Sequence, residues 1–424
     1  MRLRAATGPL DATVEVPGSK SIANRALVCA ALADGESELV GIPLGDDTRA
    51  MTECLTRLGV AVSAANDRAL VTGTGGRLAA GAVRLDTGLA GTTSRFVTAM
   101  ATLAPGPVTV DGDPPLRRRP MGPLHDALLA LGADVRAQGG AGHLPVTVTG
   151  PLRHGGKVEL PGDVSSQFLT ALMLIGPLLE GGLEIALSTP LVSVPYVELT
   201  ARVMAAFAVE GVDVGGDRVV VPAGRYRGAG FAIEPDASSA SYPLAMAAVA
   251  GGRVRVPGLT VKSAQADVRF AGLLGAMGCR VGESSTALDV TRDPQSPLRG
   301  IDVDLRDNSD LVPTLAVVAA TAATETRIRG VGFIRAKESD RLGDLAAELA
   351  RTGATVGVED DGLVIGPGQL HGARLDPHDD HRLAMAFGVL GTVVDGVEVT
   401  DPGVVSKSWP EFWTVRDEIV RSAG

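Results

Sequence analysis

The sequence predicts an α/β protein of two domains, built from six copies of one repeat. Its 424 residues exceed what one hydrophobic core ordinarily supports, so at least two domains are expected. Hydrophobic residues make up 45% of the chain and aromatic residues only 3%, which favours small aliphatic side chains packed between helices and sheets. The third observation is an internal repeat with a spacing of 69 to 75 residues.

Each repeat contains the same succession of predicted elements. A short alternating strand is followed by a turn of Pro, Gly, Asp, Asn or Ser, a small polar cluster, an Ala/Leu-rich helix of 12 to 15 residues and a second strand. The repeats begin at Val14, Val83, Val158, Ala232, Val303 and Ala373. One supersecondary unit is therefore expected to recur along the whole chain.

The helix starts of the repeats predict chemistry as well as architecture. Ser, Thr, Asp or Asn falls at each start, as N-capping requires, and capping alone would explain these residues. Cations also occur there, and capping requires none of them: Lys20, Arg25, Arg95 and Arg382. Helix N-termini attract anions, so starts that converge on a common centre would bind a ligand with several negative groups.

The first start, PGSKSIANR, places Lys20 and Ser21 at the beginning of a helix, with Arg25 one turn further on. Lys supplies a compact charge, and Arg supplies a planar fork for a carboxylate or phosphate. A solvated helix start is the alternative. In the second start, GLAGTTSR, Gly91 leaves the backbone open to close approach by a ligand, and Arg95 follows one turn later.

Two further motifs are ambiguous by themselves. DVSSQF offers Ser165, Ser166 and Gln167 at a helix start, which suits a phosphate but also suits a cap with a spare serine. RAKESDR places Lys337 and Arg341 one turn apart, and a charged surface helix would look the same.

Several classes of function are disfavoured. A formal net charge of -10 argues against broad binding to nucleic acid or anionic membranes. The RRRP run at 117–120 has no interleaved aromatic residues, so an arginine clamp on a small anion is preferred. TGTGGR, at 72–77, lacks the dinucleotide-binding spacing and is interpreted as a turn.

No metal site or cofactor is expected. The three cysteines show no ligand spacing and suit a reducing cytosol, and His381 is interpreted as a packing or hydrogen-bonding residue. The N-terminal segment has no apolar signal-peptide core, and no apolar run is long enough for a membrane span. We therefore expect a cytoplasmic protein.

Taken together, the motifs resemble those of the 5-enolpyruvylshikimate-3-phosphate synthase (3-phosphoshikimate 1-carboxyvinyltransferase) family. PGSKSIANR, LAGT, RRP, SSQF, SVPY, KESDR, DHRLAMAF and SKSWP follow one another in the family's order from about Thr13 to Phe412. The resemblance implies a two-domain inside-out α/β barrel, with three βαβαββ repeats in each domain, that closes on its substrates. It also implies that one domain interrupts the other: residues 1–16 with 235–424 form the first, and residues 17–234 form the second.

The resemblance further implies the reaction. The 5-hydroxyl of shikimate 3-phosphate adds to phosphoenolpyruvate while C3 of phosphoenolpyruvate is protonated, and phosphate then leaves as C3 returns the proton. Asp310 matches the base for the hydroxyl, Glu338 matches the carboxylate that helps to move the C3 proton, and Lys20 is the third implied catalytic residue.

The other site residues are carried over from the motifs. Those implied to bind shikimate 3-phosphate are Lys20, Ser21, Arg25, Ser165, Ser166, Gln167, Ser193, Tyr196, Asp310 and Lys337. Those implied to bind phosphoenolpyruvate are Lys20, Gly91, Arg119, Gln167, Arg341, Arg382 and Lys407. The implied partners are these two small anions, with glyphosate as a possible inhibitor and with no nucleic acid or membrane, and a monomer is expected.

The sequence departs from the family pattern at three places. Leu89 stands where many members have Asn, Phe333 and Ile334 replace a common Asn-Trp pair, and Phe96 replaces a common Pro. These changes are expected to alter substrate affinity and inhibitor response, and Phe96 is expected to shift the helix that begins near Gly91.

Two alternatives remain open at this point. The sister family that transfers enolpyruvyl to UDP-N-acetylglucosamine has Lys-Asn in the first motif and a loop cysteine, whereas this chain has Lys20-Ser21 and no cysteine in DGDPPLRRRP. A non-enzymatic, ring-shaped repeat clamp would need cations spread along an interior surface, whereas here they cluster at helix starts.

Overall fold

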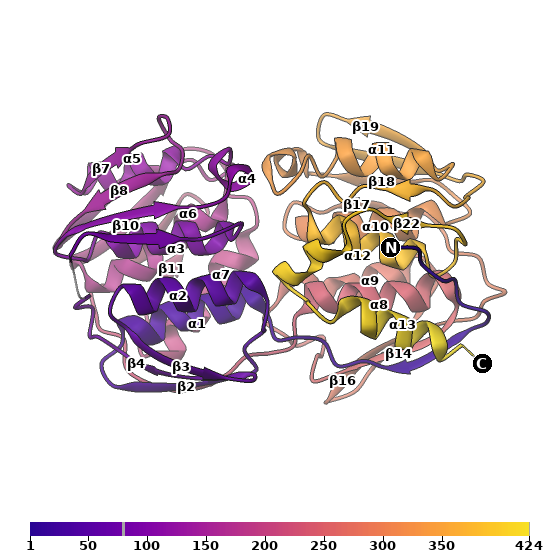
Figure 1. Cartoon of the computed structure of the whole chain (residues 1–424), viewed down its shortest axis with the longest axis horizontal. Coiled ribbons are helices and arrows are strands. Elements are labelled where there is room, and N and C mark those ends of the chain that lie inside the picture. Colours follow the sequence, from indigo (N-terminus) through magenta and orange to yellow (C-terminus); the bar gives the residue numbers. More distant parts are fainter. Residues whose placement is uncertain (79–80, 424) are drawn as a thin grey trace. The chain divides into compact units, whose positions relative to one another are not determined.

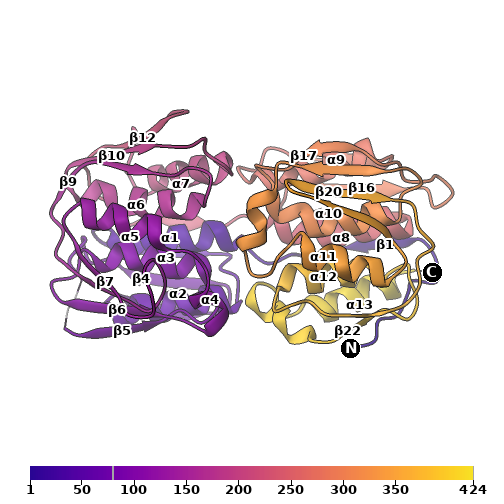
Figure 2. The ribbon, with the colours of Figure 1, turned by 90° about the horizontal axis from the view of Figure 1, so that it is seen from above.

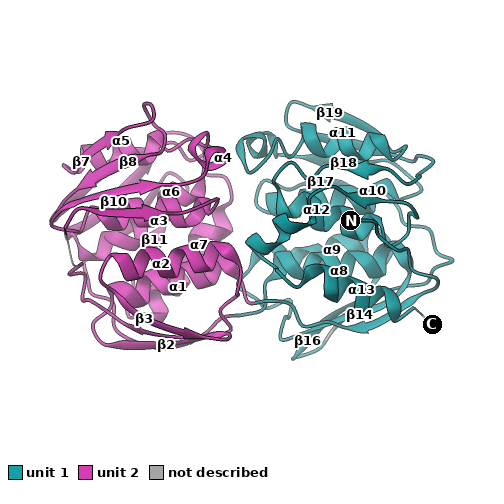
Figure 3. Ribbon diagram, viewed as in Figure 1, with its two compact units in different colours: residues 1–17, 234–424 teal, residues 18–233 magenta. Residues whose placement is uncertain are grey.

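The structure is a computed structural model that describes residues 1–78 and 81–423. The chain divides into two compact units, as Figure 3 shows. Unit 1 comprises Met1–Pro17 and Glu234–Gly424, and unit 2 comprises Gly18–Ile233. The chain therefore passes between the units twice, after Pro17 and after Ile233.

Unit 2 contains three four-stranded sheets with one topology. In each sheet, the first two strands are parallel. The second strand pairs with an antiparallel third strand, and the third pairs with an antiparallel fourth strand. The orders are β13-β2-β4-β3, β5-β6-β8-β7 and β9-β10-β12-β11. The strands are β2 (Glu36–Val40), β3 (Ala61–Ala65), β4 (Arg68–Thr72), β5 (Val83–Asp86), β6 (Pro107–Asp111), β7 (Asp134–Ala137), β8 (Val146–Thr149), β9 (His154–Leu160), β10 (Glu180–Leu187), β11 (Asp213–Val214), β12 (Arg218–Val221) and β13 (Gly230–Ala232).

Unit 1 repeats this topology twice and varies it once. Its sheets have the orders β1-β14-β16-β15, β17-β18-β20-β19 and β21-β22. The strands are β1 (Leu10–Thr13), β14 (Gly252–Pro257), β15 (Arg280–Glu283), β16 (Ala287–Arg292), β17 (Asp302–Asp304), β18 (Thr326–Arg329), β19 (Thr355–Glu359), β20 (Gly362–Gly366), β21 (Arg374–Leu375) and β22 (Glu398–Val399).

The first strands of two repeats are exchanged between the units. β1 precedes the first helix of unit 2, yet it pairs in parallel with β14 of unit 1. β13 precedes the first helix of the next unit 1 repeat, yet it pairs in parallel with β2 of unit 2. The family resemblance implied this exchange. The repeat pattern alone predicted that the first strand begins at Val14, which lies just beyond the end of β1.

The N-terminal segment completes the two-stranded sheet of unit 1. The amide of Leu3 donates to the carbonyl of Val397 at 2.9 Å, and the amide of Val399 donates to the carbonyl of Met1 at 2.8 Å. Arg2 forms an antiparallel bridge with Glu398. In each of the other sheets, the strand equivalent to β22 has an antiparallel neighbour from its own repeat. In this sheet, residues 1–3 take the place of that neighbour.

In each unit the helices lie inside and the sheets lie outside, as Figures 1 and 2 show. This is the inside-out α/β arrangement that was expected. The first helices of the repeats are the most deeply buried, because they are rich in Ala, Leu and Val: α1 (Lys20–Leu32), α3 (Gly91–Ala101), α6 (Ser166–Ile175), α8 (Ala237–Ala250), α10 (Val312–Ala320) and α12 (His381–Leu390). Several are shorter than the 12 to 15 residues predicted, with α10 at 9 residues.

The second helices of the repeats and the short helices complete the two units. The second helices are α2 (Asp46–Arg57), α5 (Gly122–Ala130), α7 (Val194–Ala206), α9 (Arg269–Ala276), α11 (Gly343–Arg351) and α13 (Phe412–Arg421), with α4 (Pro114–Arg117) preceding α5. The 3-10 helices are η1 (Gly176–Leu178), η2 (Ala266–Val268), η3 (Ser309–Leu311), η4 (Gly332–Ala336) and η5 (Pro402–Lys407). Among the described residues, no helix combines the length and apolar character that a membrane crossing requires.

The prediction of a side-chain cap at every helix start was only partly right. Ser165, Asp236 and Asp380 accept a hydrogen bond from a backbone amide in the first turn of α6, α8 and α12. The residue before α1 is Ser19, whose side chain makes no capping bond, and the residue before α3 is Ala90. At these two starts no described side chain caps the backbone N–H groups of the first turn.

We expect Leu3→Ala to lower the free energy of unfolding by about 2–5 kcal/mol, since it empties a core position. Leu3 is buried, and its Cδ1 would lie 2.5 Å from a Cβ added at Gly391, so it packs closely against the end of α12. Urea unfolding measures the change. Arg4→Ala, an exposed neighbour, is the control, and an equal effect of both substitutions would contradict the assigned packing.

Candidate active site

Asp310 of unit 1 is surrounded by three cations. It lies in η3, directly before α10, and its side chain is 18% exposed. Arg341 Nη1 approaches Asp310 Oδ1 at 2.8 Å, and Arg382 Nη2 approaches Asp310 Oδ2 at 2.7 Å. Lys337 Nζ lies 3.5 Å from Asp310 Oδ1. Both carboxylate oxygens are thus engaged by guanidinium groups.

Arg341 joins this carboxylate to two others. Its Nε donates to Asp380 Oδ2 at 2.6 Å, and its Nη2 donates to Glu338 Oε2 at 2.8 Å. The Arg341 side chain is 1% exposed and that of Asp380 is fully buried. Asp380 also accepts the backbone amide of Arg382 as the cap of α12, so it fixes Arg341 and the start of a helix together.

The KESDR segment, 337–341, lies between η4 and α11 and is not a surface helix. Glu338 Oε1 lies 3.8 Å from Nζ of Lys407, which ends η5 and is buried. Lys337, Glu338, Arg341, Arg382 and Lys407 therefore gather with Asp310 in one cluster.

The electrostatics of Asp310 are dominated by its neighbours. Burial by itself would raise its pKa, but the positive charges of Arg382, Lys337 and Arg341 outweigh burial and hold the pKa of Asp310 well below its usual range. The carboxylate is therefore ionised at neutral pH, and its basicity depends on how those three cations are engaged.

A further buried carboxyl group, Asp267, lies near enough to this cluster to feel the charges of Asp310 and Arg382. Ser238 Oγ donates to Asp267, and Asn308 Nδ2 donates to Asp267 Oδ1 at 3.2 Å. Burial, reinforced by the negative charge of Asp310, raises the pKa of Asp267 to about 6. Two carboxyl groups of one unit thus have pKa values displaced in opposite directions.

In unit 2, Lys20 is the first residue of α1, and its Nζ lies 2.8 Å from Asp47 Oδ2 in α2. The pair is largely buried, with side-chain exposures of 15% and 4%. Asp47 therefore orients Lys20, and sequence analysis did not assign Asp47 to the site.

Arg25 has a buried guanidinium group that donates to neutral oxygen atoms of the described residues. Nε donates to Thr200 Oγ1 at 2.8 Å, Nη1 to the carbonyl of Ser21 at 2.7 Å and Nη2 to the carbonyl of Tyr196 at 3.2 Å. Burial lowers the pKa of Arg25 to about 10. Phe96 packs against Arg25, with the ring centroid 5.6 Å from the guanidinium carbon.

Gly91 begins α3 beside two arginines. A Cβ added at Gly91 would lie 2.6 Å from Arg119 Nη1 and 2.7 Å from Arg95 Nη1. Arg95 Nη1 donates to the carbonyl of Gly91 at 2.9 Å, and its Nη2 donates to the carbonyl of Pro120 at 3.1 Å. The absence of a side chain at Gly91 therefore leaves room for these guanidinium groups at the helix start.

The starts of α3 and α6 are joined by a hydrogen bond from Gln167 Nε2 to Thr92 Oγ1 at 3.3 Å. Gln167 Oε1 is buried and has no hydrogen-bond partner among the described residues. Ser165 accepts the amide of Gln167 as the cap of α6, while Ser166 is the first residue of that helix. Ser193 precedes α7 with a φ of 58°, and Tyr196 lies in its first turn.

The structure thus gathers the predicted residues into two groups, each within one unit. The unit 1 group contains Asp310, Lys337, Glu338, Arg341, Arg382 and Lys407. The unit 2 group contains Lys20, Ser21, Arg25, Gly91, Arg119, Ser165, Ser166, Gln167, Ser193 and Tyr196. Asp47 and Asp380, the partners of Lys20 and Arg341, were missed, although both stand in acidic pairs at helix starts and could have been suspected from that position.

Comparison with known proteins identifies this constellation. A sequence model of the family described as EPSP synthase (3-phosphoshikimate 1-carboxyvinyltransferase) matches residues 5–415. The chain belongs to the EPSP synthase family. The resemblance read from the motifs is therefore confirmed, and the chain is an enzyme of the transferase class.

Relatives match over almost their whole length. The chain is 44% identical over 409 residues to a 3-phosphoshikimate 1-carboxyvinyltransferase of Methanoculleus marisnigri, with 96% of each chain covered. It is 41% identical over 417 residues to one of Nostoc punctiforme, with 98% of this chain and 97% of the relative covered. The solved structure of EPSP synthase from Acinetobacter baumannii has a TM-score of 0.83 at 25% identity and covers 99% of this chain and 97% of its own.

Two departures from the family pattern have a visible structural role. Lys337 Nζ lies 5.9 Å from the ring centroid of Phe333, so an aromatic face stands beside this cation. Phe96 is buried against Arg25, and α3 still begins at Gly91. The aromatic substitutions therefore contact two of the cations assigned to the site.

We expect Asp380→Ala to destabilise unit 1 by about 3–5 kcal/mol, because it leaves the buried Arg341 guanidinium without its closest partner. Urea unfolding followed by circular dichroism measures the loss. Asp302→Ala is the control, since Asp302 and its partner Arg329 are both 56% exposed and such pairs contribute about 1 kcal/mol or less. Similar losses for the two variants would contradict a supporting role for Asp380.

A pH dependence follows from Asp267. Its pKa of about 6 in the folded chain exceeds the ordinary value of 3.8, so the folded state binds the proton more tightly. The resulting stability is complete below the ordinary value and is lost as pH rises towards 6. Relative to Asp267→Asn, the wild type should lose up to about 3 kcal/mol between pH 4 and pH 7. Urea unfolding across this range measures it, with the uncharged, exposed Ser284→Ala as control; a pH-independent difference would contradict the raised pKa.

Proposed function

We propose that this enzyme transfers the enolpyruvyl group of phosphoenolpyruvate to the 5-hydroxyl of shikimate 3-phosphate and releases phosphate. Its relatives are named 3-phosphoshikimate 1-carboxyvinyltransferase, which supports this reaction. The observation that carries the proposal is the unit 1 cluster, in which one buried guanidinium, Arg341, contacts both Asp310 and Glu338 at 2.8 Å. Two carboxylates and several cations held together can move protons beside an anionic substrate.

The unit 2 group has the chemistry to bind shikimate 3-phosphate. Ser165 and Ser166 lie at the N-terminus of α6, where backbone N–H groups and hydroxyls suit a phosphate. Arg25 has only neutral oxygen partners in the described chain, so a substrate carboxylate or hydroxyl would add to its contacts without displacing an ion pair. The buried Gln167 Oε1 can accept a hydrogen bond from a substrate hydroxyl.

The remaining cations suit phosphoenolpyruvate, which carries a phosphate and a carboxylate. In unit 1 these are Arg341, Arg382 and Lys407, and in unit 2 they are Lys20 and Arg119 beside Gly91. Guanidinium groups bind such oxyanions in bidentate fashion, and Arg341 is held in place for this role by Asp380.

Asp310 would take the proton of the 5-hydroxyl as its oxygen bonds to C2 of phosphoenolpyruvate. C3 gains a proton in the same addition, with Lys20 and Glu338 as the groups that move it. In the second step the bond from C2 to the phosphate oxygen breaks, C3 gives up a proton, and the enol ether and phosphate are formed. Phosphate carries away the electron pair of the broken bond, so the reaction needs no redox partner.

Substrate binding would itself activate the base. Arg382, Lys337 and Arg341 hold the pKa of Asp310 low, and an anion that draws these cations to itself reduces that effect. The pKa of Asp310 would then rise towards values at which a carboxylate accepts a proton more readily. Asp310 would thus become basic only when the anionic substrate is bound.

Asp310→Asn should lower kcat by about 10²–10⁴-fold, the usual contribution of a general base, while shikimate 3-phosphate still binds. Phosphate release with both substrates measures turnover, and isothermal titration measures binding. Asp304→Asn, an exposed carboxylate of the same unit paired with Arg306, is the matched control. Near-normal turnover of Asp310→Asn would reject its assignment as base, and no phosphate release by the wild type would reject the proposed function.

Gly91→Ala should raise the KM for phosphoenolpyruvate on the order of tenfold, the loss expected when one charge-assisted contact is displaced. The added Cβ collides with the flexible ends of Arg119 and Arg95, so the guanidinium groups shift while the fold is kept. Steady-state kinetics at saturating shikimate 3-phosphate measure the effect. Gly272→Ala, whose Cβ meets nothing within 4 Å, is the control; an unchanged KM in Gly91→Ala would contradict the role of this position.

We also propose that the enzyme works in the cytoplasm as a monomer and that glyphosate competes with phosphoenolpyruvate. Glyphosate carries a phosphonate and a carboxylate, the same pair of anionic groups that the arginines are proposed to bind. Inhibition that disappears at high phosphoenolpyruvate concentration would support this competition, and inhibition that is independent of phosphoenolpyruvate would contradict it.

A further inference from the structure

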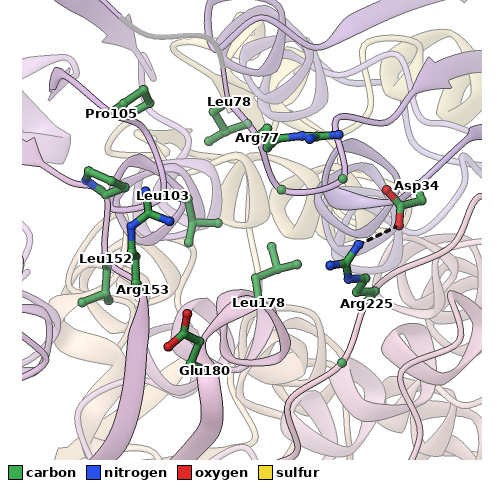
Figure 4. Close-up of a pocket in the computed structure, with 14 residues that line it drawn as sticks. Asp34, Arg77, Leu78, Leu103, Pro105, Leu152, Arg153, Leu178, Glu180 and Arg225 are labelled. Carbon is green, nitrogen blue, oxygen red and sulfur yellow. Dashed lines mark ion pairs between the residues drawn. The ribbon is translucent and has the colours of Figure 1, made fainter.

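Unit 2 contains a pocket that the proposed reaction does not use. It has a volume of about 550 Å³ and lies where the first helices of the three unit 2 repeats end. Figure 4 shows the residues that line it. Asp34 follows α1, Leu103 follows α3, and Leu178 ends the short helix after α6. The residues assigned to substrate binding stand at the opposite, N-terminal ends of these helices. Because α1 has 13 residues, the two ends are about 20 Å apart.

Three arginines surround the pocket, and each comes from a different repeat. Arg77 follows β4, Arg153 follows β8 and Arg225 follows β12, so all three occupy equivalent loops after the last strand of a repeat. Arg77 belongs to the TGTGGR segment, which is a turn, as the sequence predicted, and has no part in the proposed reaction. The threefold recurrence of the repeat thus places three guanidinium groups around one cavity.

The arginines are not explained by bonds within the protein. Arg225 Nη1 lies 3.9 Å from Asp34 Oδ2, a weak and exposed contact. The guanidinium groups of Arg77 and Arg153 form no hydrogen bond or ion pair with any residue that the structure describes. Cations near helix C-termini are favoured by the helix dipole, but guanidinium groups placed for that purpose alone would be expected to donate to the terminal carbonyls.

Four leucines form an apolar part of the pocket lining. Leu78 and Leu103 are buried, and Leu152 and Leu178 are half-buried, while the three arginines are exposed at the rim. Figure 4 shows these leucine side chains among the arginines. The leucines can contact the hydrocarbon part of a ligand, and the arginines at the rim can pair with an anionic group of that ligand.

Glycines allow the loop before Arg77 to approach the pocket. A Cβ added at Gly75 would lie 2.4 Å from Asp34 Oδ1, and one added at Gly76 would lie 3.0 Å from Leu178 Cδ1. Both glycines also have a positive φ, 59° and 78°, which L side chains rarely adopt. The loop is therefore held against the pocket in a conformation that larger residues would prevent.

We propose that this pocket binds a small monocarboxylate with an apolar ring or chain. Guanidinium groups at the rim pair with the carboxylate, and the leucines contact the apolar body. Asp34 and Glu180 also line the pocket, and their negative charges disfavour a ligand with several anionic groups. The ligand class therefore differs from that of the doubly anionic substrates proposed for the other ends of the same helices.

The test uses 3-phenylpropanoate as the probe and ligand-observed NMR titration of the full chain. The uncharged 3-phenylpropanol has the same ring and tests the need for the carboxylate. We expect saturable binding of 3-phenylpropanoate, weakened at least tenfold in the double variant Arg77→Ala/Arg153→Ala. The alcohol should bind at least tenfold more weakly to the wild type.

Arg136→Ala is the matched control, because Arg136 is an exposed arginine of the same unit that pairs with Asp134 outside the pocket. It should bind the probe like the wild type. Thermal unfolding midpoints verify that all variants are folded. The proposal is overturned if the wild type shows no saturable binding, if the double variant binds as tightly as the wild type, or if the alcohol binds as tightly as the carboxylate. None of these outcomes depends on whether the enolpyruvyl transfer is correct.

Discussion

The arrangement of unit 1 depends on the buried guanidinium of Arg341. Its Nε donates to Asp380, its Nη1 to Asp310 and its Nη2 to Glu338, and its side chain is 1% exposed. A buried charge of this kind is tolerated only when its partners satisfy it, so the positions of the three carboxylates are linked to one another. Asp380 contributes most to this linkage, because it is fully buried and also caps α12. A structural ion pair thereby sets the orientation of two groups proposed to move protons.

Arg25 of unit 2 has a different environment from the arginines of the unit 1 cluster. In unit 1, Arg341 and Arg382 already pair with carboxylates, which keeps Asp310 ionised and weakly basic. In unit 2, Arg25 is buried among neutral oxygens, and the cost of burial appears as a pKa lowered to about 10. An incoming anion would relieve that cost at Arg25, whereas in unit 1 it would compete with an existing carboxylate. The environment of Arg25 therefore suits tight substrate binding. The environment of Arg341 and Arg382 suits a change in the proton affinity of Asp310 when the substrate binds.

Much of this organisation could be predicted from the sequence, because the repeats make the same helix start recur with polar and cationic residues. The spacing indicated six repeats, and the motifs indicated the residues that the structure gathers at Asp310 and at Lys20. What could not be predicted from the residues depends on contacts between distant segments. The repeat pattern does not reveal that residues 1–3 pair with β22, or that Asp47 and Asp380 hold Lys20 and Arg341. Nor does it distinguish starts capped by a side chain, such as Ser165, from the start of α3 after Ala90.

The repeats have a consequence at both ends of their central helices. When a repeated unit builds a helix bundle, the equivalent ends of its helices lie together. Residues at equivalent positions of different repeats are therefore neighbours, even when they lie more than 70 residues apart in sequence. In unit 2 this places hydroxyls, Lys20 and Arg119 near helix N-termini and Arg77, Arg153 and Arg225 near the C-terminal ends. The N-terminal ends add their own partial positive charge and therefore suit phosphates. The C-terminal ends add partial negative charge, so a ligand there must gain more from apolar contact and carry less charge. The same helices can thus select different ligands at their two ends.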